Sequence, residues 1–200
     1  DKKSFIKIIQ DSGESLLVLI NDILDVSLIE AGQLKTSKKK FLLKPFLDSL
    51  FRIAAIQFRS NNLDFSVYSE EIADNDYIVT DAERLKQVLF NFINNARKFT
   101  SEGFVSLTVR KVTRSTLTEY FNTDPNDLPA SAYFFLIQDS GIGIDDASFQ
   151  ELFIPFRKLH NKSRLFEGIG LGLSISKRLI TLLNGDVWLT SQKGKGTTFY

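Results

Sequence analysis

Apolar residues near the start of the chain recur at the spacing of a coiled-coil helix. They alternate at intervals of three and four, with one glycine among them, along the stripe Ile6, Ile9, Gly13, Leu16, Ile20 and Ile23. A second stripe, of Leu17, Leu24 and Leu28, widens the apolar face beyond the needs of a two-stranded coiled coil. The pattern predicts one helix of a four-helix bundle over residues 1–31, ended by Gly32. An ordinary core helix packed on its own domain is the alternative.

The rest of the chain mixes strand and helix patterns. Alternating apolar residues predict strands at 41–43, 63–69, 104–112, 133–138 and 186–191. Helical spacing predicts helices at 45–59, 81–99, with Asp81 as N-cap, and 169–183, and a short helix follows Ile144. Residues 114–130 contain two prolines and no periodicity, which predicts a loop insertion.

This order of elements lacks the strict alternation of a doubly wound sheet. It indicates an α+β fold, a two-layer α/β sandwich preceded by the bundle helix. Four lysines between Gly32 and Lys40 suggest a boundary, so we expect one unit at 1–33 and a second at 34–200. We also expect a fragment with a truncated C-terminal strand, because the chain has no Met, begins within a helical pattern and ends within a strand pattern.

Composition excludes several classes of function. The 200 residues hold 25 Lys+Arg and 24 Asp+Glu, so no global positive field favours nucleic acid. The absence of Cys excludes disulfides, a thiolate nucleophile and Cys-ligated metal. Apolar runs are far shorter than the roughly 20 residues of a membrane span. We therefore expect a cytoplasmic fragment without a membrane segment, although the full-length protein could still be anchored.

The helix predicted at 81–99 has a polar stripe beside its apolar face. Asn91, Asn95 and Lys98 are separated by four and three residues, so their side chains share one side of the helix. Amide oxygens can complete the octahedral shell of Mg²⁺ around a polyphosphate, and the lysine adds a positive charge. Solvated asparagines on an exposed helix are the alternative.

Two glycine motifs follow strand or helix boundaries. Asp139-Ser-Gly-Ile-Gly143 comes directly after a predicted strand, where it can present a carboxylate beside an accessible backbone or form a simple Asx turn. Gly168-Ile-Gly-Leu-Gly172 opens a helix, whose first N–H groups can bind phosphate, and a bare helix cap is the alternative. A dinucleotide-binding unit is excluded because no strand precedes this second motif, and no Walker sequence occurs.

Taken in order, these motifs resemble the N box and glycine boxes of sensor histidine kinases. The matching segments are Asn91-Phe-Ile-Asn-Asn-Ala-Arg-Lys-Phe-Thr100, Asp139-Ser-Gly-Ile-Gly143, Phe153-Ile-Pro-Phe156, Gly168-Ile-Gly-Leu-Gly172 and Gly194-Lys-Gly-Thr-Thr-Phe199. Upstream, Leu24-Asp-Val-Ser-Leu-Ile-Glu-Ala-Gly32 resembles the second dimerisation helix of hybrid kinases. The resemblance implies a sandwich of the GHKL type that binds ATP under a lid.

It also implies roles for individual residues. The adenine side would comprise Asp139, which accepts the adenine amino group, with Gly141, Gly143 and Thr197. Asn95, helped by Asn91, would hold Mg²⁺. The phosphate side would comprise Lys98, Gly168, Gly170, Leu171 and Gly172, with Phe153 and Phe156 anchoring a lid at about 157–167, mobile without nucleotide, from which Lys158 could reach the terminal phosphate.

The resemblance further implies partners outside this sequence. The phosphoacceptor histidine would lie on a first dimerisation helix before Asp1, and the single histidine, His160, has no adjacent carboxylate and is interpreted as a surface residue. We therefore expect a homodimer through the N-terminal helix, an acceptor helix in the full-length protein and a response-regulator receiver domain. A GHKL-type ATPase is an alternative, although Asn91 stands where hydrolytic relatives have a glutamate; a nucleotide-binding scaffold is another.

Overall fold

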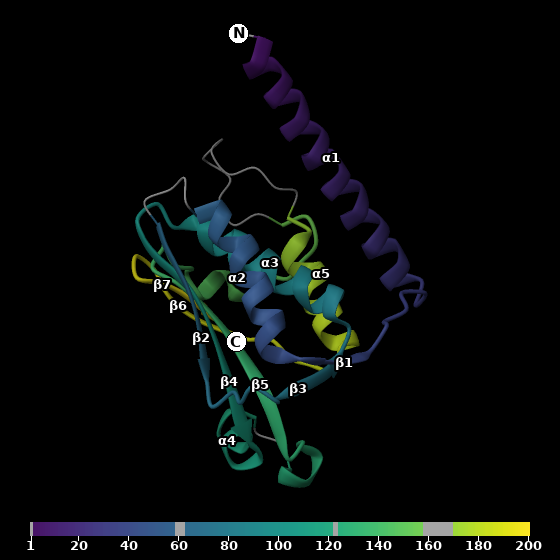
Figure 1. The fold of residues 1–200 in the computed structure, drawn as a ribbon, viewed down its shortest axis with the longest axis vertical. Helices are drawn as coiled ribbons and strands as arrows, with labels where there is room; N and C mark the ends of the chain where they lie inside the picture. Colours follow the sequence, from purple (N-terminus) through teal and green to yellow (C-terminus); the bar gives the residue numbers. More distant parts are fainter. Residues whose placement is uncertain (1, 59–62, 122–123, 158–169) are drawn as a thin grey trace.

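A computed structural model describes residues 2–58, 63–121, 124–157 and 170–200 (Figure 1). Its helices are α1 (Lys2–Glu30), α2 (Leu43–Phe58), α3 (Ala82–Phe99), α4 (Arg114–Tyr120) and α5 (Gly172–Leu182), with 3₁₀ turns η1 (Pro125–Asp127) and η2 (Asp146–Glu151). Its strands are β1 (Lys39–Leu42), β2 (Leu63–Glu70), β3 (Tyr77–Thr80), β4 (Gly103–Thr113), β5 (Ser131–Asp139), β6 (Leu189–Gln192) and β7 (Gly196–Phe199).

The main layer is a five-stranded sheet in the order β2-β4-β5-β7-β6. β2 and β4 are parallel, and the other neighbours are antiparallel. Helices α2, α3 and α5 cover one face of this sheet, while β1 and β3 form a separate antiparallel pair at its side (Figure 1). The predicted α+β two-layer sandwich is therefore confirmed.

The core lies between that sheet face and the three helices. On β4, Val105, Leu107 and Val109 are fully buried, as alternation along a strand requires when one face is covered. From the helical side, α3 contributes the buried Ile93 and also Phe92, whose ring lies 4.8 Å from that of Phe199 on β7. This contact holds α3 against β7, in the part of the sheet that carries the polar motifs.

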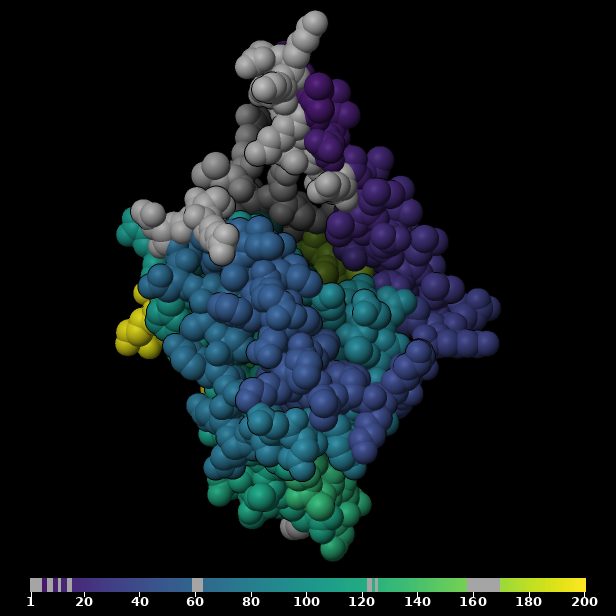
Figure 2. All heavy atoms as spheres, in the orientation of Figure 1, coloured from purple at the N-terminus to yellow at the C-terminus, as the bar shows by residue number. Residues whose placement is uncertain are grey.

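The predicted N-terminal helix is confirmed as α1, and Gly32 ends it. Gly32 adopts a φ of 64°, and the N–H of Gln33 donates to the carbonyl of Leu28, which closes the last turn of the helix. In Figure 2 the atoms of α1 form a ridge along one side of the molecule. No helix of the described residues is long and apolar enough to cross a membrane.

The sheet periphery differs from the sequence prediction in three places. Residues 114–130 are not a structureless loop: they form α4 and η1, and Leu117 of α4 packs with Val112 and Phe134 in a second apolar cluster. Val112 on β4 and Phe134 on β5 alternate along their strands with the residues that face the main core, so the second cluster lies on the opposite face of the sheet. The strand β3 was not predicted, and α2 begins at Leu43, two residues before Pro45.

Candidate functional site

The first part of the site is the buried carboxylate of Asp139 at the end of β5. Its side chain is 7% exposed, and the N–H of Gly141 donates to Oδ1 over 2.8 Å. Burial raises the pKa of Asp139, while hydrogen bonds from the backbone N–H groups of Gly141 and Thr197 oppose the rise. The Asx turn that the sequence left open is thus present, and the carboxylate retains acceptor capacity beyond it.

Glycines let three backbone segments converge around this carboxylate. A Cβ on Gly141 would overlap the carbonyl oxygen of Phe99, at the end of α3. Gly143 has a φ of 65° and Gly196 a φ of 109°, and a Cβ on either would overlap a backbone carbonyl, of Gln192 and Asp139 respectively. These glycines therefore hold the turn after β5 against both α3 and the β6–β7 hairpin.

Hydroxyl groups continue the site from Asp139 onto the last two strands. Thr197, opposite Asp139 in the β5–β7 register, is 5% exposed, and its Oγ1 lies 2.9 Å from the Oγ of Ser191. Ser191 Oγ also accepts from the N–H of Ile144. A cavity of about 250 Å³ opens here, lined by Gln138, Asp139, Thr190, Ser191, Gln192, Lys195, Gly196, Thr197 and Thr198. Among the described residues the cavity is lined by residues of β5, β6, β7 and the β6–β7 turn, and by none of the asparagines on α3.

The second part of the site is the contact between α3 and the start of α5. The Nδ2 of Asn91 donates to Ser176 Oγ over 2.7 Å, and Asn95 Nδ2 lies 3.5 Å from Asn91 Oδ1. A Cβ on Gly172 would overlap Asn91 Oδ1, so a larger residue there would displace the Asn91 side chain from its present position. Lys98 lies one turn further along α3 and is half-buried, with its Nζ 5.3 Å from the ring centre of Phe99.

The start of α5 has no side-chain cap. Leu171 is the N-cap residue, its side chain is buried, and among the residues that the structure describes no side-chain hydrogen bond caps the helix there. Gly170 precedes it with a φ of 81°, and its carbonyl accepts from the N–H of Phe156. Phe156 itself has a φ of 64° and is 65% exposed. Backbone N–H groups at such a helix start can bind an anion.

The segment before Phe156 is anchored on the same helix. Phe153 packs against the main core, and the Nζ of Lys177 on α5 lies 4.9 Å from its ring centre. Arg157 forms an ion pair with Glu151 at 2.7 Å. This segment is therefore held at both ends before the chain leaves the described residues at 158.

The structure brings most of the predicted site residues together through α3. Asp139, Gly141, Gly143 and Thr197 gather near the C-terminal end of this helix, whereas Gly172 meets its middle at Asn91, with Gly170 and Leu171 directly before it in the chain. The predictions for Lys158, His160, Gly168 and most of the lid at 157–167 lie outside the described residues. Sequence reasoning missed Ser176 and Ser191, because single serines outside the motifs give no signal of their own.

A family comparison agrees with this geometry. Residues 80–200 match the family described as histidine kinase-, DNA gyrase B-, and HSP90-like ATPase. The chain belongs to this ATPase family. The match begins at β3 and includes every described site residue from Asn91 to Thr197. The sequence-based assignment is therefore confirmed at the level of the family.

Individual relatives resemble the whole chain. Hybrid signal transduction histidine kinase B of Dictyostelium discoideum is 37% identical over 201 residues, covering 99% of this chain and 9% of the relative. The chain spans only between 9% and 26% of the curated relatives it matches. The resemblance to hybrid sensor histidine kinases read from the motifs is thus confirmed.

Solved structures share the fold, including α1. Full-length ShkA in complex with AMPPNP superposes with a TM-score of 0.77 and 24% identity, covering 98% of this chain and 37% of ShkA. The histidine kinase ThkA in complex with the response regulator TrrA gives a TM-score of 0.65 at 21% identity, covering 98% of this chain and 48% of ThkA. Both matches extend beyond the family segment to the N-terminal helix.

Proposed function

We propose that this chain binds Mg²⁺·ATP and is the catalytic part of a hybrid sensor histidine kinase, which transfers the γ-phosphate to a histidine outside residues 1–200. The observation that supports this most is the buried carboxylate of Asp139, fixed by backbone N–H groups in the turn that packs against the C-terminal end of α3. A carboxylate so fixed suits the amino group of adenine, with Gly141, Gly143 and Thr197 around it.

The phosphates would lie between α3 and the start of α5. We propose that the uncapped N–H groups from Gly170 to Gly172 and the ammonium of Lys98 face the phosphates. Gly168, Phe156 and Lys158 would complete this side.

The donor set of α3 fits Mg²⁺. Asn91 and Asn95 are neutral oxygen donors, and Mg²⁺ commonly takes one or two protein ligands together with substrate phosphates. Among the described residues no group of three or more acidic or imidazole side chains forms an alternative metal site. When bound, the ion would neutralise charge on the phosphates, while the chain itself supplies binding and orientation.

We further propose that α1 is the second dimerisation helix, through which two copies associate, and that residues 34–200 form the ATP-binding domain. The acceptor histidine would come from a preceding helix, and a receiver domain would take the phosphoryl group from it. TrrA in the ThkA complex supports a response-regulator partner, and AMPPNP in the ShkA complex supports the proposed nucleotide. Since ATP is a cytoplasmic substrate, the proposed activity lies in the cytoplasm.

Calorimetry with a non-hydrolysable ATP analogue tests the adenine assignment. Asp139→Asn replaces one acceptor oxygen with a donor facing the adenine amino group, so we expect affinity to fall by about 1 to 3 kcal/mol. Unchanged affinity would remove Asp139 from the site. Release of free phosphate from ATP that Asn95→Ala abolishes would favour the hydrolytic class, and binding without transfer to an added acceptor domain would favour a scaffold.

The raised pKa of Asp139 adds a pH dependence with opposite signs for binding and stability. As pH falls through this pKa, the carboxylate becomes protonated and accepts hydrogen bonds less well. Because the pKa is raised, we expect this loss of ATP affinity to begin at a higher pH than it would for an exposed aspartate. The folded chain also holds the proton more tightly than the unfolded chain. The free energy of unfolding without nucleotide should therefore decrease as pH rises from the ordinary value through the raised pKa.

Affinity and thermal unfolding measured over one pH series would check both signs. Asp139→Asn should remove this contribution from each curve. If affinity in the unmodified chain followed an ordinary aspartate pKa, the carboxylate would not be buried as described.

A further inference from the structure

Ser176 is a buried hydroxyl that no sequence motif singled out. It lies in the second turn of α5, 2% exposed, beyond the glycine motif that ends at Gly172. Its Oγ accepts a 2.7 Å hydrogen bond from Nδ2 of Asn91, which lies on α3. The bond therefore joins the helix of the proposed metal ligands to the helix of the proposed phosphate site.

The carboxamide of Asn91 is held at both of its ends. While Nδ2 donates to Ser176, Oδ1 lies 3.5 Å from the Nδ2 of Asn95 and faces the first turn of α5 at Gly172. Turning the amide over would bring two NH₂ groups, of Asn91 and Asn95, face to face. The hydrogen bonds thus specify which end of Asn91 points toward Asn95 and the start of α5.

That orientation matters for a metal site. Only the oxygen of a carboxamide can ligate Mg²⁺, because the NH₂ group has no lone pair available for a hard cation. We propose that Ser176 is a positioning residue. Because its Oγ accepts a hydrogen bond from the NH₂ group of Asn91, the Asn91 oxygen lies beside Asn95 and points toward the proposed phosphate-binding start of α5. This inference rests on the function proposed above.

The fold offers a matched comparison two residues away. Ser174 is also on α5 and is 4% exposed, but its Oγ donates to the carbonyl of Leu171 within its own helix. Removal of either hydroxyl deletes one hydrogen bond made by a buried serine of the same helix. Only removal of the Ser176 hydroxyl leaves the Asn91 amine without its acceptor.

The test is the Mg²⁺ dependence of nucleotide affinity. Calorimetry with a non-hydrolysable ATP analogue, in excess Mg²⁺ and in EDTA, would compare the 200-residue chain with Ser176→Ala, Asn91→Ala and the double variant. We expect Ser176→Ala to lose about tenfold in affinity with Mg²⁺, as for loss of one hydrogen bond, and little in EDTA. The double variant should be no weaker than Asn91→Ala alone, because Ser176 acts through Asn91.

Ser176→Thr keeps a hydroxyl and should restore the Mg²⁺ dependence. Ser174→Ala should lower the unfolding temperature while leaving the ratio of the two affinities unchanged. If Ser176→Ala lowered only the unfolding temperature while Asn91→Ala abolished the Mg²⁺ dependence, this inference would be overturned and the proposed function would stand. If the unmodified chain bound no nucleotide, both would be overturned.

Discussion

Helices α1 and α3 have similar apolar periodicity and opposite surroundings. On α3 the apolar stripe is covered by the sheet and α5, and Ile93 at its centre is 0% exposed. On α1 the corresponding stripe faces outward: Leu17 is 62% exposed and Ile9 70%. The same three-four spacing therefore forms the centre of the core in one helix and an open surface in the other.

The difference shows what helical periodicity does and does not determine. It fixes which side of a helix is apolar, because side chains three and four apart share a face. It does not identify what covers that side. A monomer rarely exposes so large an apolar surface, which agrees with the proposal that a second copy packs on α1.

The largest effect is expected from truncation of the covered stripe. Ile93→Ala should lower the free energy of unfolding by about 2 to 5 kcal/mol, because it leaves a cavity between α3 and the sheet. Leu17→Ala should leave the stability of a dilute, monomeric chain nearly unchanged. Denaturant unfolding at low protein concentration measures both.

The same pair of variants can sharpen the comparison at high protein concentration. If two copies pack through α1, the Leu17→Ala variant should become destabilised relative to the unmodified chain as concentration rises. A large loss for Leu17→Ala at the lowest concentration would instead show that its side chain is already covered within one chain.

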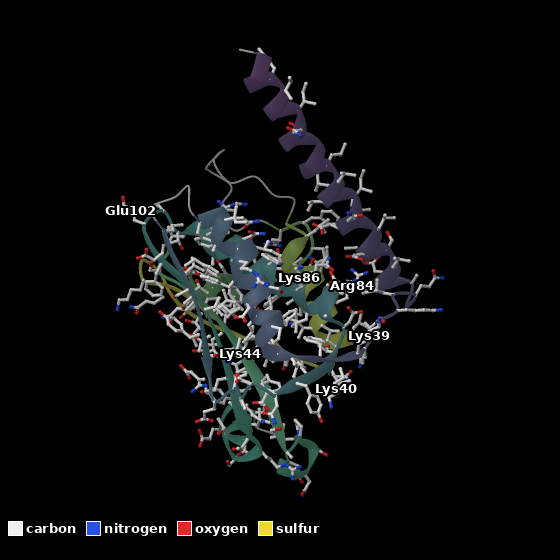
Figure 3. All side chains as sticks on the ribbon, viewed as in Figure 1. Lys39, Lys40, Lys44, Arg84, Lys86 and Glu102 are labelled. Atoms are coloured by element: carbon white, nitrogen blue, oxygen red, sulfur yellow. The ribbon has the colours of Figure 1, made fainter. Side chains whose placement is uncertain are left out.

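The joint between α1 and α3, formed by Asp25 of α1 with Arg84 and Gln87 of α3, should give an intermediate effect. Near the end of α1, the carboxylate of Asp25, only 7% exposed, accepts from Arg84 Nη1 at 2.8 and 2.9 Å and from Gln87 Nε2 at 2.8 Å. Figure 3 shows Arg84 on the side of α3 that faces the lower part of α1. Arg84→Ala should weaken docking of α1 by about 2 kcal/mol, because it leaves a buried charge with one partner.

Hydrogen exchange of residues 21–30 would measure this loss as faster amide exchange. Arg178→Ala is the control, because its 3.4 Å ion pair with Glu30 joins α1 to α5 through more exposed side chains. Such a pair contributes less than about 1 kcal/mol. Equal exchange rates in the two variants would mean that the Asp25 network does not hold the joint.

Much of the fold could be predicted where local chemistry and periodicity agreed. Asp81 was expected to cap α3, and its Oδ1 accepts from the N–H groups of Glu83 and Arg84. The segment 114–130 was misread because α4 is only seven residues long, too short for a periodic signal, and gains its stability from packing on Phe134 and Trp188 across the sheet. That contact depends on residues distant in sequence.

The motifs of the site could be predicted from the sequence, but the serines that hydrogen-bond to site residues could not. Asp139 and the glycines could be named because glycine and a carboxylate at a strand end suggest a specific backbone conformation. Ser176 and Ser191 could not, since a serine has no structural preference strong enough to reveal a partner such as Asn91, 85 residues away in the sequence. Such contacts become visible only when the helices are placed.

The smallest predicted effect concerns charge at the joint. Burial, followed by the negative charge of Asp25 one turn away, raises the pKa of Asp22. The folded chain therefore holds that proton more tightly than the unfolded chain, so the contribution of Asp22 to stability decreases as pH rises from below 3.8 through the raised pKa. Asp22→Asn should remove this decrease.

We expect Asp22→Asn to stabilise the joint at neutral pH by about 0.5 kcal/mol or less, because the side chain is partly exposed to solvent, which screens its charge. The gain should vanish in acid, where the carboxyl is already neutral. Asp25→Asn is the matched opposite, since Arg84 would lose its charged partner and the joint should weaken at neutral pH. Thermal unfolding of both variants at pH 3 and pH 7 would test the signs, and a gain for Asp25→Asn at neutral pH would contradict the role of Asp25 as the residue that fixes α1 to α3.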